Sequence, residues 1–365
     1  MGIFRNLMGT KEIPIKSNDD FWNWFQTKAD DFFKIIKNNG NIERDFFNHL
    51  LSKLNQLRDG YFFLAGMLDD NTAELIITAD GNLKNIVFVE ELVQSAPKMT
   101  KWKFTPLKPS MNINDISIRM GNLKFYKGNL SFYSNDNPEY PDEIDITVVY
   151  TDYKEDLKEK ITAGIYLFIE HYLGELNSMT TIDNMEIIGN DQAEKELIPI
   201  EKLKDFLIWR QKEFIEKYEG KRYHTENDSY NSLQATLDNG KPLIAIINAD
   251  LLDWDCKASH PWIITIEIKY KGDENGMPDQ DTYELMNILE EELMLSLKDS
   301  EGYLNIGRQT AESCREIYFA CKDFRLPSKI FTTIQFDYQN KLIVDYSIYK
   351  DKYWQSLNRF KPSIL

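Results

Sequence analysis

The chain has 365 residues, with 43 Lys and Arg against 59 Asp and Glu, which gives a formal net charge of −16. Its length predicts roughly two to three domains. A chain this acidic, with no run of basic residues interleaved with aromatic ones, is not expected to bind nucleic acid or an anionic membrane surface.

Cysteine usage and apolar runs exclude further classes. Cys256, Cys314 and Cys321 are an odd number with no CxxC spacing, so they indicate neither a disulfide framework nor a zinc site. The longest apolar runs have the length of a strand, well short of a membrane span. The first residues contain no extended apolar segment and no small-residue cleavage site. These exclusions together make a cytoplasmic location the expectation.

The first half of the chain alternates helical and strand patterns. The first predicted helix has a wide apolar face that includes Phe21, Trp22 and Phe25, and Asn39-Gly40 ends it. The predicted elements are, in order, helices at 19–39 and 42–57, strands at 61–68 and 74–79, a helix that ends before Pro97, a strand at 102–107, short strands over 116–150, a helix at 154–173 and a strand at 183–188.

Residues 60–190 can be divided twice into a hairpin, a helix and a strand. An internal duplication is one interpretation of this order. It rests on the order of the elements alone, because no repeat is visible at the level of residues.

The predicted domain boundary follows a helix at 199–218 that is rich in Lys and Glu. The apolar pattern stops at Glu219-Gly220-Lys221-Arg222. This predicts an N-terminal α+β domain at 1–200, a connecting helix at 201–222 and a C-terminal domain at 223–365. Within the last, Asn239-Gly240 lies between two alternating runs, which is a strong signal for a β-hairpin.

The stretch from 262 to 349 predicts a complete small fold. Ile264, Ile266 and Ile268 alternate with polar residues, as in a half-buried strand. The helical pattern at 280–298 places Leu285, Ile288, Leu289 and Leu293 on one side and Glu284, Glu290, Glu291 and Glu292 largely on the other. The elements after it complete the order β-α-β-β-α-β. Two amphipathic helices that bury against one sheet face predict an α+β, ferredoxin-like domain, with the hairpin added at its N-terminal side.

Several motifs in the last third of the chain carry a family resemblance. They are Gly240-Lys241-Pro242, Asn248, Trp262, Gly276-Met277-Pro278, Gly307-Arg308-Gln309-Thr310, Arg315-Glu316-Ile317-Tyr318-Phe319, Asp323 and Trp354. With these motifs the region from about 239 to 354 resembles a bacterial domain-of-unknown-function family, the one numbered 695. The N-terminal region is similar to uncharacterised bacterial proteins in Leu75 to Gly81, Ala96-Pro97, Trp102, Lys108-Pro109 and Leu173-Gly174-Glu175. These resemblances imply a fold rather than an activity. The C-terminal family is similar in layout to the regulator of ribonuclease activity B family, which acts by binding a protein, and that similarity is an analogy of fold.

The candidate ligand site is the hairpin of the C-terminal domain. A turn centred near Ala311-Glu312 predicts that Arg308 and Arg315 lie roughly opposite each other. Two like charges across a strand pair are destabilising unless a negative charge lies between them. An anionic ligand bound by the guanidinium groups fits this requirement, and so does a carboxylate of the fold from Glu312, Glu316 or a helix. The residues assigned to this site are Arg308, Thr310, Arg315 and Glu316.

Other polar clusters indicate no cofactor, metal or catalytic set. Asp253, Asp255, Cys256 and His260 lie within eight residues, but a zinc site needs further ligands in a defined arrangement. Glu170, His171 and Glu175 are expected on the long helix, with His171 and Glu175 four apart on one face, but without the second copy that a di-metal helix motif requires. No nucleophile elbow, P-loop or dinucleotide fingerprint is present. Whether the protein is an enzyme is left open.

Two functions remain. The first is a non-enzymatic protein that binds or regulates a protein partner, through its sheet or the cleft between domains. Its acidity and its aromatic residues near the C-terminus, Tyr349, Tyr353 and Trp354, favour this hypothesis, although Trp354 can equally cap the sheet of its own domain. The alternative is binding or turnover of a small anionic ligand at Arg308, Thr310 and Arg315. The oligomeric state is not indicated.

Overall fold

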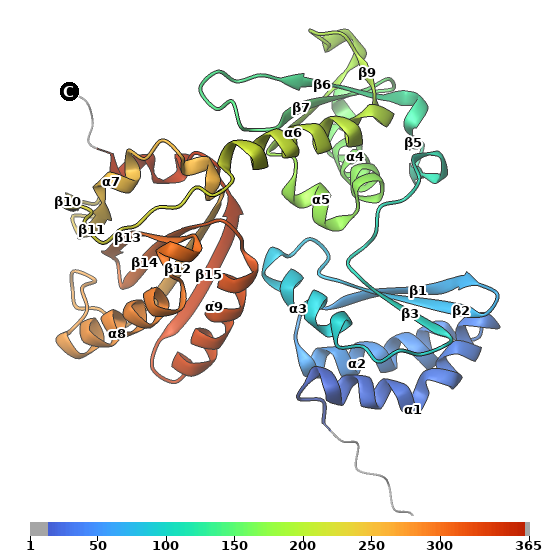
Figure 1. Cartoon of the computed structure of the whole chain (residues 1–365), viewed down its shortest axis with the longest axis horizontal. Helices are drawn as coiled ribbons and strands as arrows, with labels where there is room; N and C mark the ends of the chain where they lie inside the picture. Colours follow the sequence, from blue (N-terminus) through green and yellow to red (C-terminus); the bar gives the residue numbers. More distant parts are fainter. Residues whose placement is uncertain (1–13, 362–365) are drawn as a thin grey trace, which may run out of the picture. The chain divides into compact units, whose positions relative to one another are not determined.

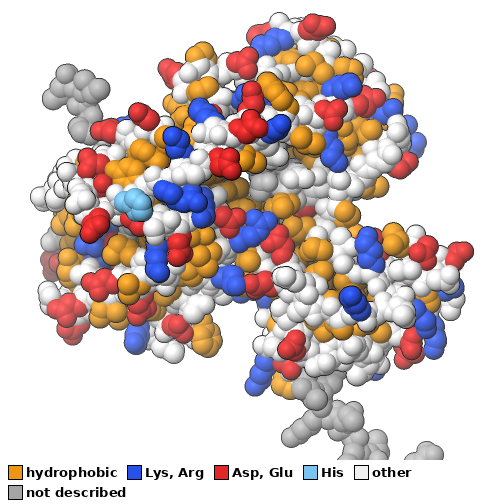
Figure 2. Space-filling model, in the orientation of Figure 1, with side chains coloured by type: hydrophobic (Ala, Val, Ile, Leu, Met, Phe, Trp, Pro, Cys, Tyr) orange, Lys and Arg blue, Asp and Glu red, His pale blue; other side chains and the backbone are white. Residues whose placement is uncertain are grey.

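The computed structural model describes residues 14–361, and the chain forms two compact units that separate between Pro109 and Ser110 (Figure 1). Both units combine helices with sheets, as the α+β prediction required. On the face seen in Figure 2, acidic and basic side chains are interspersed.

Within residues 14–109, the first unit consists of a three-stranded sheet and three α-helices. Its sheet has the order β1-β2-β3, in which β1 is antiparallel and β3 is parallel to β2. Figure 1 shows α1 and α2 along one face of this sheet. The helices are α1 Asn18–Lys37, α2 Asn48–Leu57, which follows a π-helical turn at Glu43–Phe47, and α3 Leu83–Gln94; the strands are β1 Phe62–Asp69, β2 Thr72–Thr78 and β3 Trp102–Pro106.

Aromatic packing closes the core of the first unit. Phe25 of α1 meets Trp102 and Phe104 of β3 edge-on, with ring centroids 5.0 and 5.5 Å apart. The indole of Trp22, which is buried, donates a hydrogen bond to the carbonyl of Leu92 at 2.7 Å. Edge-to-face aromatic pairs contribute beyond the area they bury, so this unit has a complete core of its own.

The second unit begins with a four-stranded sheet and its helices. This sheet has the order β8-β7-β6-β9, and a separate hairpin pairs β4 with β5. The strands are β4 Ser117–Met120, β5 Leu123–Tyr126, β6 Leu130–Asn135, β7 Asp145–Tyr150, β8 Asn184–Gly189 and β9 Ile198–Pro199; the helices are α4 Lys158–Leu173, α5 Glu175–Thr180 and α6 Leu203–Tyr218.

The two divisions predicted within residues 60–190 are both found. β1 and β2 form an antiparallel hairpin, α3 follows, and β3 pairs in parallel with β2. In the same way β6 and β7 form a hairpin, α4 follows, and β8 pairs in parallel with β7. The order hairpin, helix, strand is therefore confirmed, while descent from a duplication stays a prediction.

The second unit ends with a six-stranded sheet in the order β10-β11-β13-β14-β12-β15, in which every neighbouring pair is antiparallel. The predicted hairpin is its β10-β11 pair, with Gly240 at φ +81° in the turn. The strands are β10 Tyr230–Thr236, β11 Pro242–Asn248, β12 Trp262–Lys269, β13 Tyr303–Ala311, β14 Cys314–Cys321 and β15 Ile343–Lys350; the helices are α7 Ala249–Leu252, α8 Gln280–Ser296 and α9 Arg325–Tyr338.

This sheet has a core on each face. On one face α9 contacts β15, and the ring of Phe331 in α9 packs on Tyr346 at 5.3 Å. On the other face Leu304, Ile306 and Tyr318 pack against α7 and a final 3-10 helix at Gln355–Phe360. Trp354 belongs to this second core, because it is buried and its indole donates a hydrogen bond to the carbonyl of His260 at 3.0 Å.

A β-bulge in β13 changes the face to which its side chains point. The register against β14 shifts between Asn305 and Gly307, so Leu304 and Ile306 both face the second core, whereas Arg308 faces the helices. Gly307 adopts φ +138°, and a Cβ there would lie 2.2 Å from the carbonyl oxygen of Ile246 in β11. Only glycine fits at this close approach.

A buried ionic network joins the two sheets of the second unit. Asp183 lies 2.7 Å from the ammonium groups of both Lys350 and Lys352. Nearby, Tyr353 donates a hydrogen bond to Asp142 at 2.6 Å. The predicted connecting helix corresponds to α6, which lies inside the second unit because the two units separate at Pro109. The separation at Pro109 falls within the predicted domain 1–200.

Among residues 14–361, no helix combines the length and the apolar character that a membrane crossing requires.

The same network predicts a pH dependence of stability through Glu143. Burial, followed by the negative charges of Asp145 and Asp183, raises the pKa of Glu143 from 4.5 to about 7. The folded state therefore holds more protons than the unfolded state between these pH values, so Glu143 lowers the free energy of unfolding as pH rises through this window. We expect Glu143→Gln to match the wild type at pH 4 and to be more stable above pH 7.

Urea unfolding of both proteins across this pH range measures the difference. Glu139→Gln, on the exposed part of the same loop, is the control and should show no such trend. A constant difference between Glu143→Gln and wild type at all pH values would contradict the assignment.

Candidate functional site

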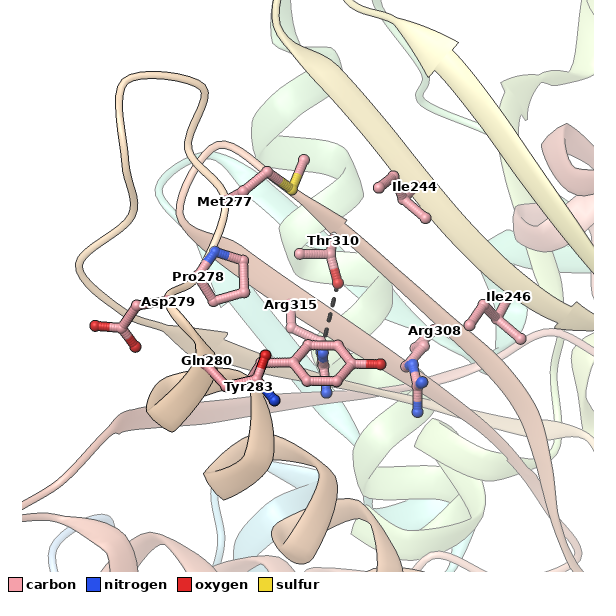
Figure 3. Close-up of a pocket in the computed structure, with 10 residues that line it drawn as sticks. All are labelled: Ile244, Ile246, Met277, Pro278, Asp279, Gln280, Tyr283, Arg308, Thr310 and Arg315. Carbon is pink, nitrogen blue, oxygen red and sulfur yellow. Dashed lines mark hydrogen bonds between the residues drawn. The ribbon is translucent and has the colours of Figure 1, made fainter.

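A pocket of about 400 Å³ opens on the helix-covered face of the C-terminal sheet (Figure 3). It lies beside the hairpin that the sequence singled out. Its walls come from β11, from the loop before α8, from the first turns of α8 and from β13 and β14. The lining residues are Ile244, Ile246, Met277, Pro278, Asp279, Gln280, Tyr283, Arg308, Thr310 and Arg315.

The turn between β13 and β14 decides which side chains meet there. Glu312 and Ser313 form a two-residue turn, with φ +49° and +64°, and Ala311 pairs with Cys314. Positive φ at both positions is the geometry that matches the twist of a hairpin. Arg315 therefore lies opposite Thr310 rather than opposite Arg308.

The prediction that Arg308 and Arg315 lie opposite each other was wrong, because the turn is displaced by one residue. Arg308 pairs with Ile317, and the expected turn at Ala311-Glu312 is one residue too early. The two arginines remain diagonal neighbours on the same face, within reach of long side chains. Both line the pocket together with Thr310.

Arg315 is a buried cation, with 1% of its surface exposed. Its Nη1 donates a hydrogen bond to the amide oxygen of Asn287 at 2.8 Å, and its Nε donates a longer one to Thr310 at 3.4 Å. Its guanidinium carbon lies 5.1 Å from the ring centroid of Tyr283, a cation–π contact. Within residues 14–361 no carboxylate forms an ion pair with it.

Arg308 has an internal partner. Its Nη1 lies 2.5 Å from the Glu290 carboxylate, which is almost fully buried. A carboxylate of the fold was one of the two alternatives for this site, and a helix glutamate supplies it. Burial lowers the pKa of Arg315, the charge of Arg308 lowers it further, and Glu290 acts in the opposite direction. The site therefore holds two cations and one close anion.

Helix α8 presents the partners of both arginines. Tyr283, Asn287 and Glu290 recur at steps of four and three, so they lie on one face of α8. The sequence analysis placed Glu290 on the polar side, which was wrong, because Glu290 is 6% exposed. Ile288, expected on the buried side, is 51% exposed. The i, i+4, i+7 spacing of Tyr283, Asn287 and Glu290 was the signal that could have revealed this face.

Glu316 does not belong to the pocket. It follows Arg315 on β14 and so points to the opposite face of the sheet. There it accepts hydrogen bonds from Gln309, at 2.8 Å, and from the hydroxyl of Tyr318, and it lies 3.7 Å from Arg359. Of the four predicted site residues, the structure brings together Arg308, Thr310 and Arg315.

The loop before α8 forms one wall of the pocket and is fixed to the hairpin turn. The carbonyl of Gly276 accepts hydrogen bonds from the Ser313 amide at 2.8 Å and from the Tyr270 hydroxyl at 3.0 Å. Gly276 has φ +78°, and a Cβ there would lie 2.8 Å from the Cα of Glu312. This anchor places Met277 and Pro278 over the arginines.

The cluster around His260 is an aromatic core rather than a ligand set. The imidazole is buried 5.3 Å from the Trp254 ring, and its Nδ1 lies 2.8 Å from the Ser259 hydroxyl. Burial lowers the pKa of His260 to about 4. Across residues 14–361, no group of three or more His, Cys, Asp or Glu side chains is arranged to hold a metal ion.

The other polar candidates are structural. Helix α4 ends at Leu173 and Gly174 has φ +81°, so Glu175 starts α5 instead of following His171 on the same helix. The His171 Nδ1 lies 2.7 Å from the carbonyl of Leu167. All three cysteines are free thiols, and burial raises the pKa of Cys314 to about 11.

The second unit is an α+β structure, and its C-terminal sheet carries a pocket lined by two arginines and several apolar side chains. Residues 233–360 match the model of a family described as a family of unknown function, DUF695. This confirms the resemblance given for the C-terminal region, and three of the stretches that carry it, at 276–278, 307–310 and 315–319, meet around the pocket. No curated protein and no solved structure matches the chain.

The charge arrangement predicts a large effect of removing Glu290. We expect Glu290→Leu to lower the free energy of unfolding by about 3 kcal/mol, because it leaves two neighbouring guanidinium groups without a carboxylate. Urea unfolding at pH 7 measures this. Glu291→Leu, at the next and exposed position of α8, is the control and should change stability by less than about 0.5 kcal/mol. Equal effects of the two substitutions would show that the Glu290 carboxylate does not balance the arginines.

Proposed function

We propose that the protein binds a small anionic ligand in the pocket formed by Arg308, Thr310 and Arg315. The observation that carries this proposal is the state of Arg315, a buried guanidinium that borders a pocket and whose hydrogen-bond partners among residues 14–361 are all neutral. Burying a charge costs free energy unless an opposite charge and hydrogen bonds compensate it. Among residues 14–361, Glu290 is the one carboxylate that pairs with either of the two arginines, so an anion from outside would complete the balance at this end of the pocket.

The architecture around the pocket supports the same proposal. We infer that residues 223–365 form a ferredoxin-like domain with an added hairpin, because the order β13-β14-β12-β15 with α8 and α9 matches the split β-α-β arrangement. The hairpin β10-β11 then extends the sheet beyond β13. Ile244 and Ile246 of β11 thereby become a wall of the pocket that the smaller fold would lack.

The binding of a partner protein stays a prediction. Tyr353 and Trp354, whose exposure would have favoured it, contact Asp142 and His260 inside the chain. The Tyr349 hydroxyl donates a hydrogen bond to Ser356 at 3.0 Å. These aromatic side chains therefore serve the packing of the second unit, and the pocket has the stronger physical argument.

The test is a thermal-shift panel of phosphate, sulfate, succinate, isovalerate and phenylacetate with the full chain. We expect at least one anion to raise Tm, and we expect Arg315→Met to abolish that rise. The variant should be as stable as the wild type without ligand, or more stable by up to about 2 kcal/mol, because an apolar side chain replaces a buried charge without an ionic partner.

The matched control is Arg359→Met. Arg359 lies on the opposite face of the same sheet, where it donates a hydrogen bond to the Tyr318 hydroxyl at 2.9 Å. This variant should keep the full ligand-induced shift. The proposal is wrong if no anion in the panel raises Tm, or if the shift survives in Arg315→Met.

A further inference from the structure

We infer that the ligand of this pocket is a monocarboxylate with an apolar body, rather than an inorganic phosphate or a dicarboxylate. This inference rests on the proposed function, and it specifies the chemical class of the anion. Three features of the pocket support it: its charge balance, the free donors of Arg315 and the composition of its walls.

The charge balance favours a single negative charge. Arg308 and Arg315 contribute two cations, and the buried Glu290 carboxylate, 2.5 Å from Arg308, neutralises one of them. A monoanion balances the charge of the arginine end of the pocket, which consists of Arg308, Arg315 and Glu290, whereas a dianion adds an uncompensated charge in a partly buried environment. Asp279 strengthens this preference, because it lines the pocket with a second carboxylate.

Asp279 is positioned away from the ligand end. Its carboxylate caps α8 by accepting a hydrogen bond from the Thr282 amide at 2.8 Å. Figure 3 shows it at the outer edge, pointing away from the two guanidinium groups. It therefore does not occupy the space beside the two guanidinium groups, and it repels a second negative charge that extends towards the outer edge.

The free donors suit a planar carboxylate. Nε and Nη1 of Arg315 each donate to the protein, and within residues 14–361 no acceptor binds its Nη2. A guanidinium edge pairs with a carboxylate through two parallel hydrogen bonds. The hydroxyl of Thr310 accepts from Arg315, so its proton remains available as a third donor.

The remaining walls are apolar. Ile244 and Ile246 lie on one side, Met277 and Pro278 on the other, and the Tyr283 ring covers Arg315 (Figure 3). Ile244 is 40% exposed, so its side chain has free surface for a ligand to cover. A volume of about 400 Å³ holds a small organic molecule. Phosphate would leave these surfaces in contact with water, whereas a hydrocarbon body would bury them.

The experiment is calorimetric titration of the full chain with phenylacetate, isovalerate, acetate, succinate and phosphate. We expect phenylacetate or isovalerate to bind at least about tenfold more tightly than acetate, because apolar burial adds to the carboxylate contact. Succinate and phosphate should bind more weakly than either. Ile244→Ser should weaken phenylacetate and leave acetate unchanged.

Glu290→Gln tests the charge argument directly. This change retains the shape of the side chain and raises the net charge of the site by one. We expect it to shift the preference towards succinate and phosphate by about tenfold relative to isovalerate. Glu291→Gln is the control and should leave the ratio unchanged.

The two proposals fail in different ways. If phosphate or succinate binds most tightly and Arg315→Met abolishes that binding, the pocket is an anion site but not a monocarboxylate site. If Glu290→Gln leaves the ratio of affinities unchanged, the charge argument is wrong. If no probe binds, the inference and the proposed function are both wrong.

Discussion

The two-residue turn at Glu312-Ser313 is the constraint on which the candidate site depends. Side chains alternate between the faces of a strand, so the length of the turn decides which residues of β13 and β14 share a face. With this turn, Thr310 lies opposite Arg315, and Arg308 lies diagonally across from it. In the same turn, the Ser313 amide donates a hydrogen bond to the carbonyl of Gly276, and this bond holds the loop that forms one wall of the pocket. One local geometry thus positions both the cations and the apolar surface above them.

The order of elements could be predicted from the sequence where the apolar pattern was regular. Ile264, Ile266 and Ile268 are fully buried on β12, as their alternation indicated. Asn239-Gly240 lies in the turn that joins β10 and β11 into a hairpin. Arg308, Thr310 and Arg315 were also found together. The strand and the Asn239-Gly240 hairpin were predicted correctly because period and turn chemistry are local properties, which a single sequence displays.

The burial of Glu290 was not predicted, because it depends on a partner distant in the sequence. Glu290 was placed on the polar side of α8 because a carboxylate is normally exposed, and its burial becomes favourable only through Arg308 across the helix–sheet interface. The placement of Glu316 beside Arg315 was wrong for a local reason, because alternation along β14 puts these two neighbours on opposite faces of the sheet. The separation at Pro109 was not indicated by the sequence, because the same order of hairpin, helix and strand occurs on each side of it.

The bulge at Gly307 makes the polarity of the sheet depend on a single residue. Before it, Leu304 and Ile306 face the aromatic core; after it, Arg308 and Thr310 face α8. If the same residues paired with β14 without this bulge, strict alternation would turn Arg308 and Thr310 towards the aromatic core. Gln309 would then point at α8 instead. The ability of this sheet to carry a charged surface and an apolar surface back to back therefore depends on one extra residue in β13, in addition to the identities of the side chains.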